Sequence, residues 1–256
     1  MKAQLRFDPV AEFVKRIQRF NALDGRDHFR SFIEMAYCSY AKVTAGDKER
    51  ADKLEERYMQ IVGTLKPETV REYPELVGLI FTGLQPGGCD FLGSASSQLE
   101  ALNAQAGQFF TPYHISRCMA EMVLGDLAAT IAAKGYITIA EPACGSGGMI
   151  LAAADVFKRQ GFEPHTSMLV RATDVSPLCF QMTFLQLTLR GIPALVLHGN
   201  SLSNEAPWEQ AWTPAAIEFF ERHGRLFEEQ QPGEQSSAPM PPVTPGAPLQ
   251  LSFFAS

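Results

Sequence analysis

Residues 137–150 combine an apolar β-rich run, a glycine-rich turn and the start of a helix. Glycines let the backbone turn sharply and approach a ligand closely, and the N-terminus of the following helix offers unpaired N–H groups. Asp174 ends the next β-rich run, where a carboxylate can accept the ribose hydroxyls of an adenosine-containing cofactor. The glycine spacing is not G-x-G-x-x-G, which disfavours NAD and FAD. In the alternative interpretation, the glycines only form a tight turn and Asp174 only caps the next helix.

The elements around this loop follow an alternating pattern. Short β-rich runs are separated by helical stretches of 12 to 15 residues, which predicts a βαβαβ arrangement with parallel strands. The expected strands are Tyr136–Ala140, Met168–Ala172 and Ala194–Leu197, and the expected helices are 115–133, 147–160, 176–190 and 213–230, the last with Pro214 in its first turn.

The chain before this pattern is predicted to be helical. Phe13, Ile17 and Phe20 recur at helical spacing, further helices are expected near 29–36 and 51–65, and Pro67 starts another. The predicted fold class is α/β, a Rossmann-like and possibly truncated domain with an N-terminal helical region. The expected divisions are a helical region at 1–105, a cofactor-binding α/β domain at 106–230 and a proline-rich disordered tail at 231–256.

Composition excludes several protein classes. The 256 residues are 46% hydrophobic, which is enough for a core, and the formal net charge is −6. Residues 1–75 hold 14 Lys+Arg and 13 Asp+Glu, so no basic surplus favours unaided DNA binding. The five cysteines form no CxxC pair and the histidines are scattered, so we expect neither a metal site nor disulfides. This cysteine usage fits a reduced cytoplasmic setting, so a cytoplasmic protein is expected. The first residues contain no apolar leader, and no stretch is predicted to span a membrane.

Three segments carry a family resemblance. Residues 141–149, Glu-Pro-Ala-Cys-Gly-Ser-Gly-Gly-Met, resemble the cofactor loop of adenine-specific N6 DNA methyltransferases, above all the modification subunits of type I restriction systems. Residues 107–112, Gly-Gln-Phe-Phe-Thr-Pro, resemble the segment that precedes the first helix of that cofactor domain. Residues 90–93, Asp-Phe-Leu-Gly, resemble its usual lead-in. The order and spacing of the three segments agree with the family over about residues 88–202.

The resemblance implies S-adenosylmethionine (SAM) as cofactor. Thr111 would lie near the methionine carboxylate, and Asp174 would bind the ribose. Asn200 stands where the family usually has an acid that accepts the adenine amino hydrogens, and its amide oxygen can accept without charge assistance. The residues implied to bind the cofactor are Thr111, Glu141, Ala143, Gly145, Gly147, Asp174 and Asn200.

The family's target-base loop is missing. That loop, Asn/Asp/Ser-Pro-Pro-aromatic, activates the adenine amino group and stacks on a base flipped out of the duplex. The chain has one Pro-Pro pair, at 241–242, without polar or aromatic flanks. Trp208 or Trp212 could stack on a base, although packing is the commoner role for such residues. The catalytic residues are therefore unknown, and three expected strands are too few for a complete methyltransferase sheet.

The last residues suggest a second binding function. Gln250, Leu251, Phe253 and Phe254 resemble the peptide with which bacterial proteins bind the DNA polymerase sliding clamp. A tether that presents apolar side chains to a groove suits this role. In the alternative, this apolar end folds back onto the domain.

Two hypotheses follow. In the first, the chain is a SAM-dependent DNA adenine N6-methyltransferase of restriction–modification type, which reaches DNA through a partner subunit and has a divergent target-base loop or takes one from another chain. In the second, it is a catalytically inactive SAM-binding or DNA-associated regulatory protein, tethered to the sliding clamp. No membrane partner is expected in either case.

Overall fold

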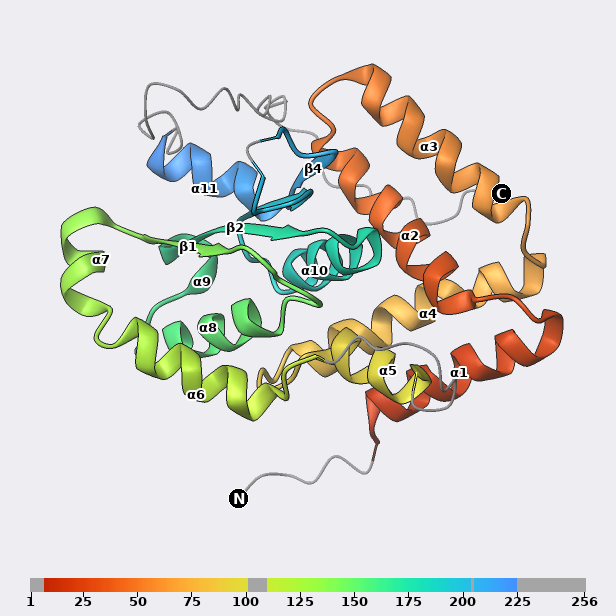
Figure 1. The fold of residues 1–256 in the computed structure, drawn as a ribbon, viewed down its shortest axis with the longest axis horizontal. Helices are drawn as coiled ribbons and strands as arrows, with labels where there is room; N and C mark the ends of the chain where they lie inside the picture. The colour runs from red at the N-terminus through yellow and green to blue at the C-terminus, as the bar shows by residue number, and fades with distance from the viewer. Residues whose placement is uncertain (1–6, 101–109, 204, 225–256) are drawn as a thin grey trace.

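The structure, a computed structural model, describes residues 7–100, 110–203 and 205–224, with the backbone alone at Glu100 (Figure 1). Within these residues, no helix is both long and apolar enough to cross a membrane. The helices are α1 (Pro9–Asp24), α2 (His28–Ala41), the short 3₁₀ helix η1 (Lys42–Thr44), α3 (Lys48–Val62), α4 (Pro67–Leu84), α5 (Phe91–Glu100), α6 (Tyr113–Leu124), α7 (Ala128–Lys134), α8 (Gly148–Arg159), α9 (Pro164–Ser167), α10 (Pro177–Leu189) and α11 (Ala215–His223). The strands are β1 (Ile137–Glu141), β2 (Met168–Asp174), β3 (Ala194–His198) and β4 (Glu209–Trp212).

The N-terminal region is helical throughout its described part, as the apolar spacing predicts. Asp8 is the N-cap of helix α1, and its side chain accepts the N–H of Val10 at 3.0 Å and so satisfies a free donor of the first turn. Its buried face carries Phe13, whose ring meets those of Phe32 and Phe91 edge to face, with centroids 5.5 Å apart in each pair. Residues of three helices thus meet in one aromatic cluster.

The sheet confirms the βαβαβ prediction. Strands β1, β2 and β3 are parallel neighbours in chain order, with Ile139 opposite Val170 and Ala172 opposite Val196. Figure 1 shows α6 and α8 below the sheet and α11 above it. The α/β fold class with an N-terminal helical region is therefore correct. All three parallel strands end at the same edge, where ligands of such sheets bind.

A fourth strand corrects the expected number of strands. Residues 209–212, Glu-Gln-Ala-Trp, pair antiparallel with β3, so that Trp212 lies opposite Leu195. This strand was missed because its residues lack the β-branched pattern, and its pairing with β3 stabilises it instead. Trp212 is buried against the far face of the sheet, so it packs in the core and does not face a ligand.

Two expected helices have different bounds. The helix expected over 115–133 is two helices, α6 and α7, because the chain breaks at Gly125, whose φ is +55°. The helix expected over 213–230 begins at Ala215, after Pro214 in its cap position, and ends at His223 with Gly224 following. Residues 225–230 lie outside the described part of the chain.

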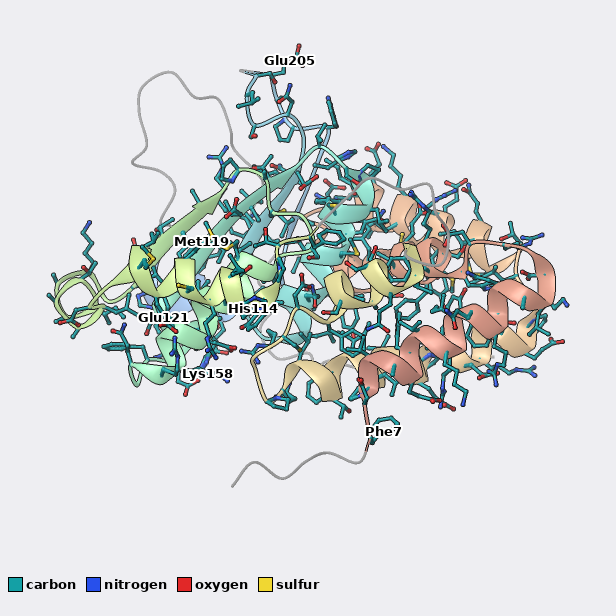
Figure 2. The ribbon with its side chains drawn as sticks, turned by 60° about the horizontal axis from the view of Figure 1, so that its bottom comes forward. Phe7, His114, Met119, Glu121, Lys158 and Glu205 are labelled. Atoms are coloured by element: carbon teal, nitrogen blue, oxygen red, sulfur yellow. The ribbon has the colours of Figure 1, made fainter. Side chains whose placement is uncertain are left out.

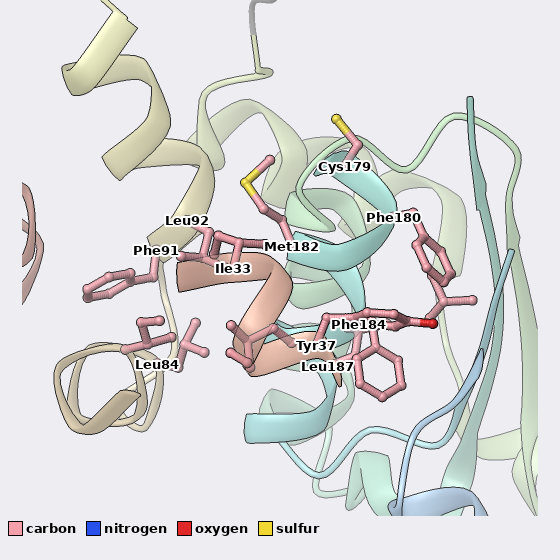
Figure 3. Close-up of a cluster of buried hydrophobic side chains, with 14 of the residues drawn as sticks. Ile33, Tyr37, Leu84, Phe91, Leu92, Cys179, Phe180, Met182, Phe184 and Leu187 are labelled. Atoms are coloured by element: carbon pink, nitrogen blue, oxygen red, sulfur yellow. The ribbon is translucent and has the colours of Figure 1, made fainter. Parts of the chain in front are cut away.

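Helix α10 joins the helical region to the sheet. It is apolar on all sides, which is typical of a helix buried on every face. Its Phe180 and Phe184 rings lie 5.1 and 5.2 Å from the Tyr37 ring of α2 (Figure 3). One continuous core therefore runs through both regions. The division at residues 105 and 230, like the tail at 231–256, remains a prediction.

Candidate cofactor-binding site

The glycine loop forms the turn that the sequence predicts. Strand β1 ends at Glu141, and α8 begins at Gly148. Gly145 and Gly147 have φ values of +55° and +94°, in the left-handed region where residues with a Cβ are strained. A Cβ at Gly147 would also lie 3.2 Å from the hydroxyl of Thr183. Both glycines are therefore required by the path of the loop.

Asp174, at the end of β2, forms hydrogen bonds with residues that follow β1, β2 and β3. One of its carboxylate oxygens accepts the N–H of Gly145 and the other that of Ser176, each at 2.8 Å. Its main-chain carbonyl accepts the N–H of Gly199, after β3, at 2.9 Å. The interpretation of Asp174 as a mere helix cap is not supported, because Ser176 caps α10 through the N–H of Cys179. The structure thus brings Gly145 and Asp174 together, as a shared ligand requires.

Glu141 lies beside the same loop. Its carboxylate is half-buried and accepts the N–H of Ala143 at 3.3 Å, while Ala143 itself is exposed. Burial raises the pKa of Glu141 above its usual range, because the charged form loses solvation, and the Ala143 N–H opposes that shift. A second acidic group therefore stands within the loop, next to the end of β1.

The upstream segment reaches the loop through an aromatic ring. A Cβ at Gly145 would lie 3.4 Å from the ring of Phe110, so these two residues are neighbours. Thr111 follows and is exposed, two residues before the start of α6. The structure therefore places Thr111 one residue from a contact with the loop. Residues 107–109 of the same motif lie outside the described part of the chain.

The loop after β3 carries Asn200. Its Oδ1 accepts the N–H of Leu202 at 3.0 Å, so the side chain closes its own turn. Trp208 lies nearby with 58% of its surface exposed, and its ring meets that of His198 at 4.9 Å. Of the two tryptophans considered for base stacking, only Trp208 presents its ring to solvent.

A buried polar cluster holds the loop from the helical side, and the sequence did not reveal it. Asp90, only 4% exposed, accepts the hydroxyl of Ser146 and, at 2.8 Å, the side-chain N–H of Gln186. Gln186 also donates to the carbonyl of Ser146 at 2.7 Å. The Asp-Phe-Leu-Gly motif was the available signal, but only the structure pairs it with Ser146.

Cys144 lies inside the loop with its side chain buried. Burial raises the pKa of its thiol to about 12, which disfavours the reactive thiolate. The hydroxyl of Thr183 donates to the Gly145 carbonyl at 2.9 Å, which fixes the loop on its inner side.

Comparison with known proteins confirms the resemblance. Residues 96–216 match the family model of N-6 DNA methylases. Among solved structures, a putative class I S-adenosylmethionine-dependent methyltransferase from Listeria monocytogenes is similar over 84% of this chain and 70% of its own, with 15% identity and a TM-score of 0.38. No curated protein matches the chain.

Proposed function

We propose that this chain binds SAM at the carboxyl ends of β1 and β2 and supports methyl transfer to the N6 atom of adenine in DNA. The observation that carries the proposal is the pairing of Gly145 with Asp174 in a segment of the N-6 DNA methylase family. Such a pairing joins a glycine loop, a helix N-terminus and a carboxylate at one edge of a parallel sheet.

The residues present fit the cofactor. Each carboxylate oxygen of Asp174 accepts one described N–H, and such an oxygen can accept about two hydrogen bonds, so capacity remains for ribose hydroxyls. Glu141 and Asp174 supply negative charge that favours a sulfonium cation. Bound SAM would supply the methyl group. The chain's own part is to hold the ribose through Asp174 and the methionine end through Glu141, Ala143, Thr111 and the loop.

The target base requires groups that this chain lacks in recognisable form. No Asn/Asp/Ser-Pro-Pro-aromatic sequence occurs in the 256 residues. We therefore propose that another polypeptide supplies the target-base loop, in a restriction–modification setting. The formal net charge of −6 supports a role for a second polypeptide, because a chain without a surplus of basic residues needs a partner to bind DNA tightly.

The second candidate is a SAM-binding regulatory protein that transfers no methyl group. Two observations favour it: the missing loop, and Asn200, which replaces the usual acid and whose Oδ1 already accepts the Leu202 N–H. Both candidates require SAM binding, and they differ only in methyl transfer. The proposed cytoplasmic setting suits either one.

The experiment has two steps. Calorimetry with SAM on the full chain is expected to show saturable binding, which Asp174→Ala abolishes and the exposed Asp52→Asn on α3 leaves unchanged. Labelled SAM is then incubated with adenine-containing DNA, the chain and co-purified partners. Transfer that needs Asp174 supports the methyltransferase, binding without transfer supports the regulator, and absence of SAM binding contradicts both.

Sliding-clamp binding is a separate proposal. Gln250, Leu251, Phe253 and Phe254 lie outside the described part of the chain, and the clamp-peptide resemblance supports it. The double variant Leu251→Ala, Phe254→Ala should lose affinity for purified clamp by at least tenfold while it keeps SAM binding. Unchanged clamp affinity would contradict the proposal.

A further inference from the structure

Asp155 on α8 lies at a point where three other parts of the chain meet. Its Oδ2 accepts the hydroxyl of Tyr113 and the N–H of Gly88, each at 2.5 Å, and its Oδ1 accepts a guanidinium N–H of Arg190 at 2.7 Å. The side chains of Asp155 and Arg190 are only 14% and 5% exposed. The carboxylate therefore has a fixed position, set by donors from the loop after α4, from α6 and from the end of α10.

Arg190 compensates the charge of Asp155 inside the molecule. Another guanidinium N–H of Arg190 donates to the main-chain carbonyl of Leu84, at the end of α4. A buried ion pair with further hydrogen bonds has a defined geometry, and removing one of its partners is costly. The pair therefore offers the Tyr113 hydroxyl an acceptor at one defined place.

Tyr113 is the first residue of α6, and its hydroxyl fixes the start of that helix. The N-cap, Pro112, makes no side-chain capping hydrogen bond. Burial raises the pKa of Tyr113 above its usual range, and the hydrogen bond to Asp155 raises it further, so the hydroxyl stays protonated and donates at neutral pH. Figure 2 shows α6, with His114 in its first turn, beside α8, which carries Lys158. The first turn of α6 is thus tied to α8 by a side chain rather than by a cap.

The residues before Tyr113 reach the glycine loop. A Cβ at Gly145 would lie 3.4 Å from the ring of Phe110, and Thr111 is exposed between Phe110 and the start of α6. Helix α8 begins directly after the loop and carries Asp155 about two turns further on. One helix thus joins the glycine loop to the carboxylate that holds Tyr113, so Thr111 is held at a fixed place beside the loop.

We propose that Tyr113 is a positioning residue for the methionine end of SAM. Through Asp155 it holds Thr111 where that residue meets the methionine carboxylate, without touching the cofactor itself. The inference rests on the proposed function, because it takes SAM to occupy the glycine loop with its carboxylate beside Thr111. A segment already in its bound position loses little conformational freedom when the ligand arrives, so a ligand that contacts the segment binds more tightly. Ligands without a methionine end gain nothing from Tyr113.

The test compares ligands by calorimetry on the full chain. S-adenosylhomocysteine and methylthioadenosine share the adenosine and the thioether sulfur, but only the first has the amino-acid end. Tyr113→Phe keeps the ring and removes the hydroxyl, so we expect Kd for SAM and S-adenosylhomocysteine to rise at least fivefold and Kd for methylthioadenosine to change less than twofold. Glu121→Gln is the matched control, because it breaks an exposed contact with Arg159, at 2.5 Å, between the same two helices. All three affinities should stay unchanged in this control.

A double-mutant cycle tests whether Tyr113 acts through Thr111. Thr111 is exposed, so Thr111→Val should fold normally, and it should show the same split between the two thioether ligands. Added to Thr111→Val, Tyr113→Phe should then weaken SAM binding by less than twofold. Equal weakening of both ligands, no weakening, full multiplication of the two effects, or loss of folding in Tyr113→Phe would overturn the inference.

The same measurements separate this inference from the proposed function. If the wild-type chain binds SAM and Tyr113→Phe changes the affinity for both thioether ligands alike, the inference fails and the proposed function stands. If the wild-type chain binds neither SAM nor S-adenosylhomocysteine, the proposed function fails and the inference falls with it.

Discussion

The two edge strands of the sheet, β4 and β1, differ in their contacts with side chains from the rest of the chain. At the β4 edge, side chains of the helical region bind the strand directly: the hydroxyl of Thr44 donates to the Trp212 carbonyl at 2.6 Å, Arg50 donates to the Gln210 carbonyl, and the Tyr37 hydroxyl donates to Glu209. At the β1 edge, no described side chain does so. Among the described residues, side chains therefore bind the edge far from the glycine loop and not the edge that leads into it.

This difference shows which contacts fix the conformation of the glycine loop. The loop after β1 is held by Asp90 and Gln186, and by Asp174 on the neighbouring strand. The cofactor half can therefore be formed before any partner arrives.

The largest expected effect is at the buried anchor of the loop. Asp90→Ala should destabilise the chain by about 3 kcal/mol in urea unfolding, because Gln186 and Ser146 lose a buried, charged acceptor. SAM affinity should fall as well, since Ser146 belongs to the loop. Asp126→Ala, at an exposed acid before α7, serves as control and should cost under 1 kcal/mol. Equal costs would contradict the anchoring role.

Removing the cover of the β4 edge should have the next largest effect. The double variant Thr44→Val, Arg50→Ala takes hydrogen-bond donors from the Trp212 and Gln210 carbonyls, so we expect about 2 kcal/mol of destabilisation. Lys42→Ala breaks only the exposed pair with Glu55 and should cost about 0.5 kcal/mol or less. A double variant as stable as Lys42→Ala would show that the cover is unimportant.

The fold and the site differ in how far sequence predicts them. The three parallel strands carry their own β-rich pattern, and the glycine loop carries its turn chemistry, so both were predictable. Strand β4 and the pairing of Asp90 with Ser146 depend on residues 50 or more positions away, as with Thr44 and Trp212. The position of β1 at the edge of the sheet could not be predicted either, because the residues of a strand do not specify which strands pair with it.

The exposed side of α6 should tolerate change in the isolated chain. Met122→Glu with Val123→Glu is expected to alter stability by about 0.5 kcal/mol or less, because both side chains already face solvent. Thermal unfolding measures this. A loss above about 2 kcal/mol would mean that another part of this chain already covers these two side chains.

The smallest effect concerns pH. Burial raises the folded-state pKa of Glu141 above its unfolded value, so the folded state binds the proton more tightly. This contribution to stability is present below the unfolded pKa and is lost as pH rises through the folded pKa. Glu141→Gln should therefore raise the melting temperature slightly at pH 7 relative to wild type, with a smaller gain at pH 4. A larger gain at pH 4 would contradict this sign.

The central claim is that residues 142–148 and Asp174 bind SAM without help from the β1 edge. Hydrogen–deuterium exchange of the full chain, with and without SAM, tests it directly. We predict slower exchange in peptides covering the loop and the end of β2, with no change in α6. Unchanged exchange in the loop at saturating SAM, or protection confined to another region, would contradict the account.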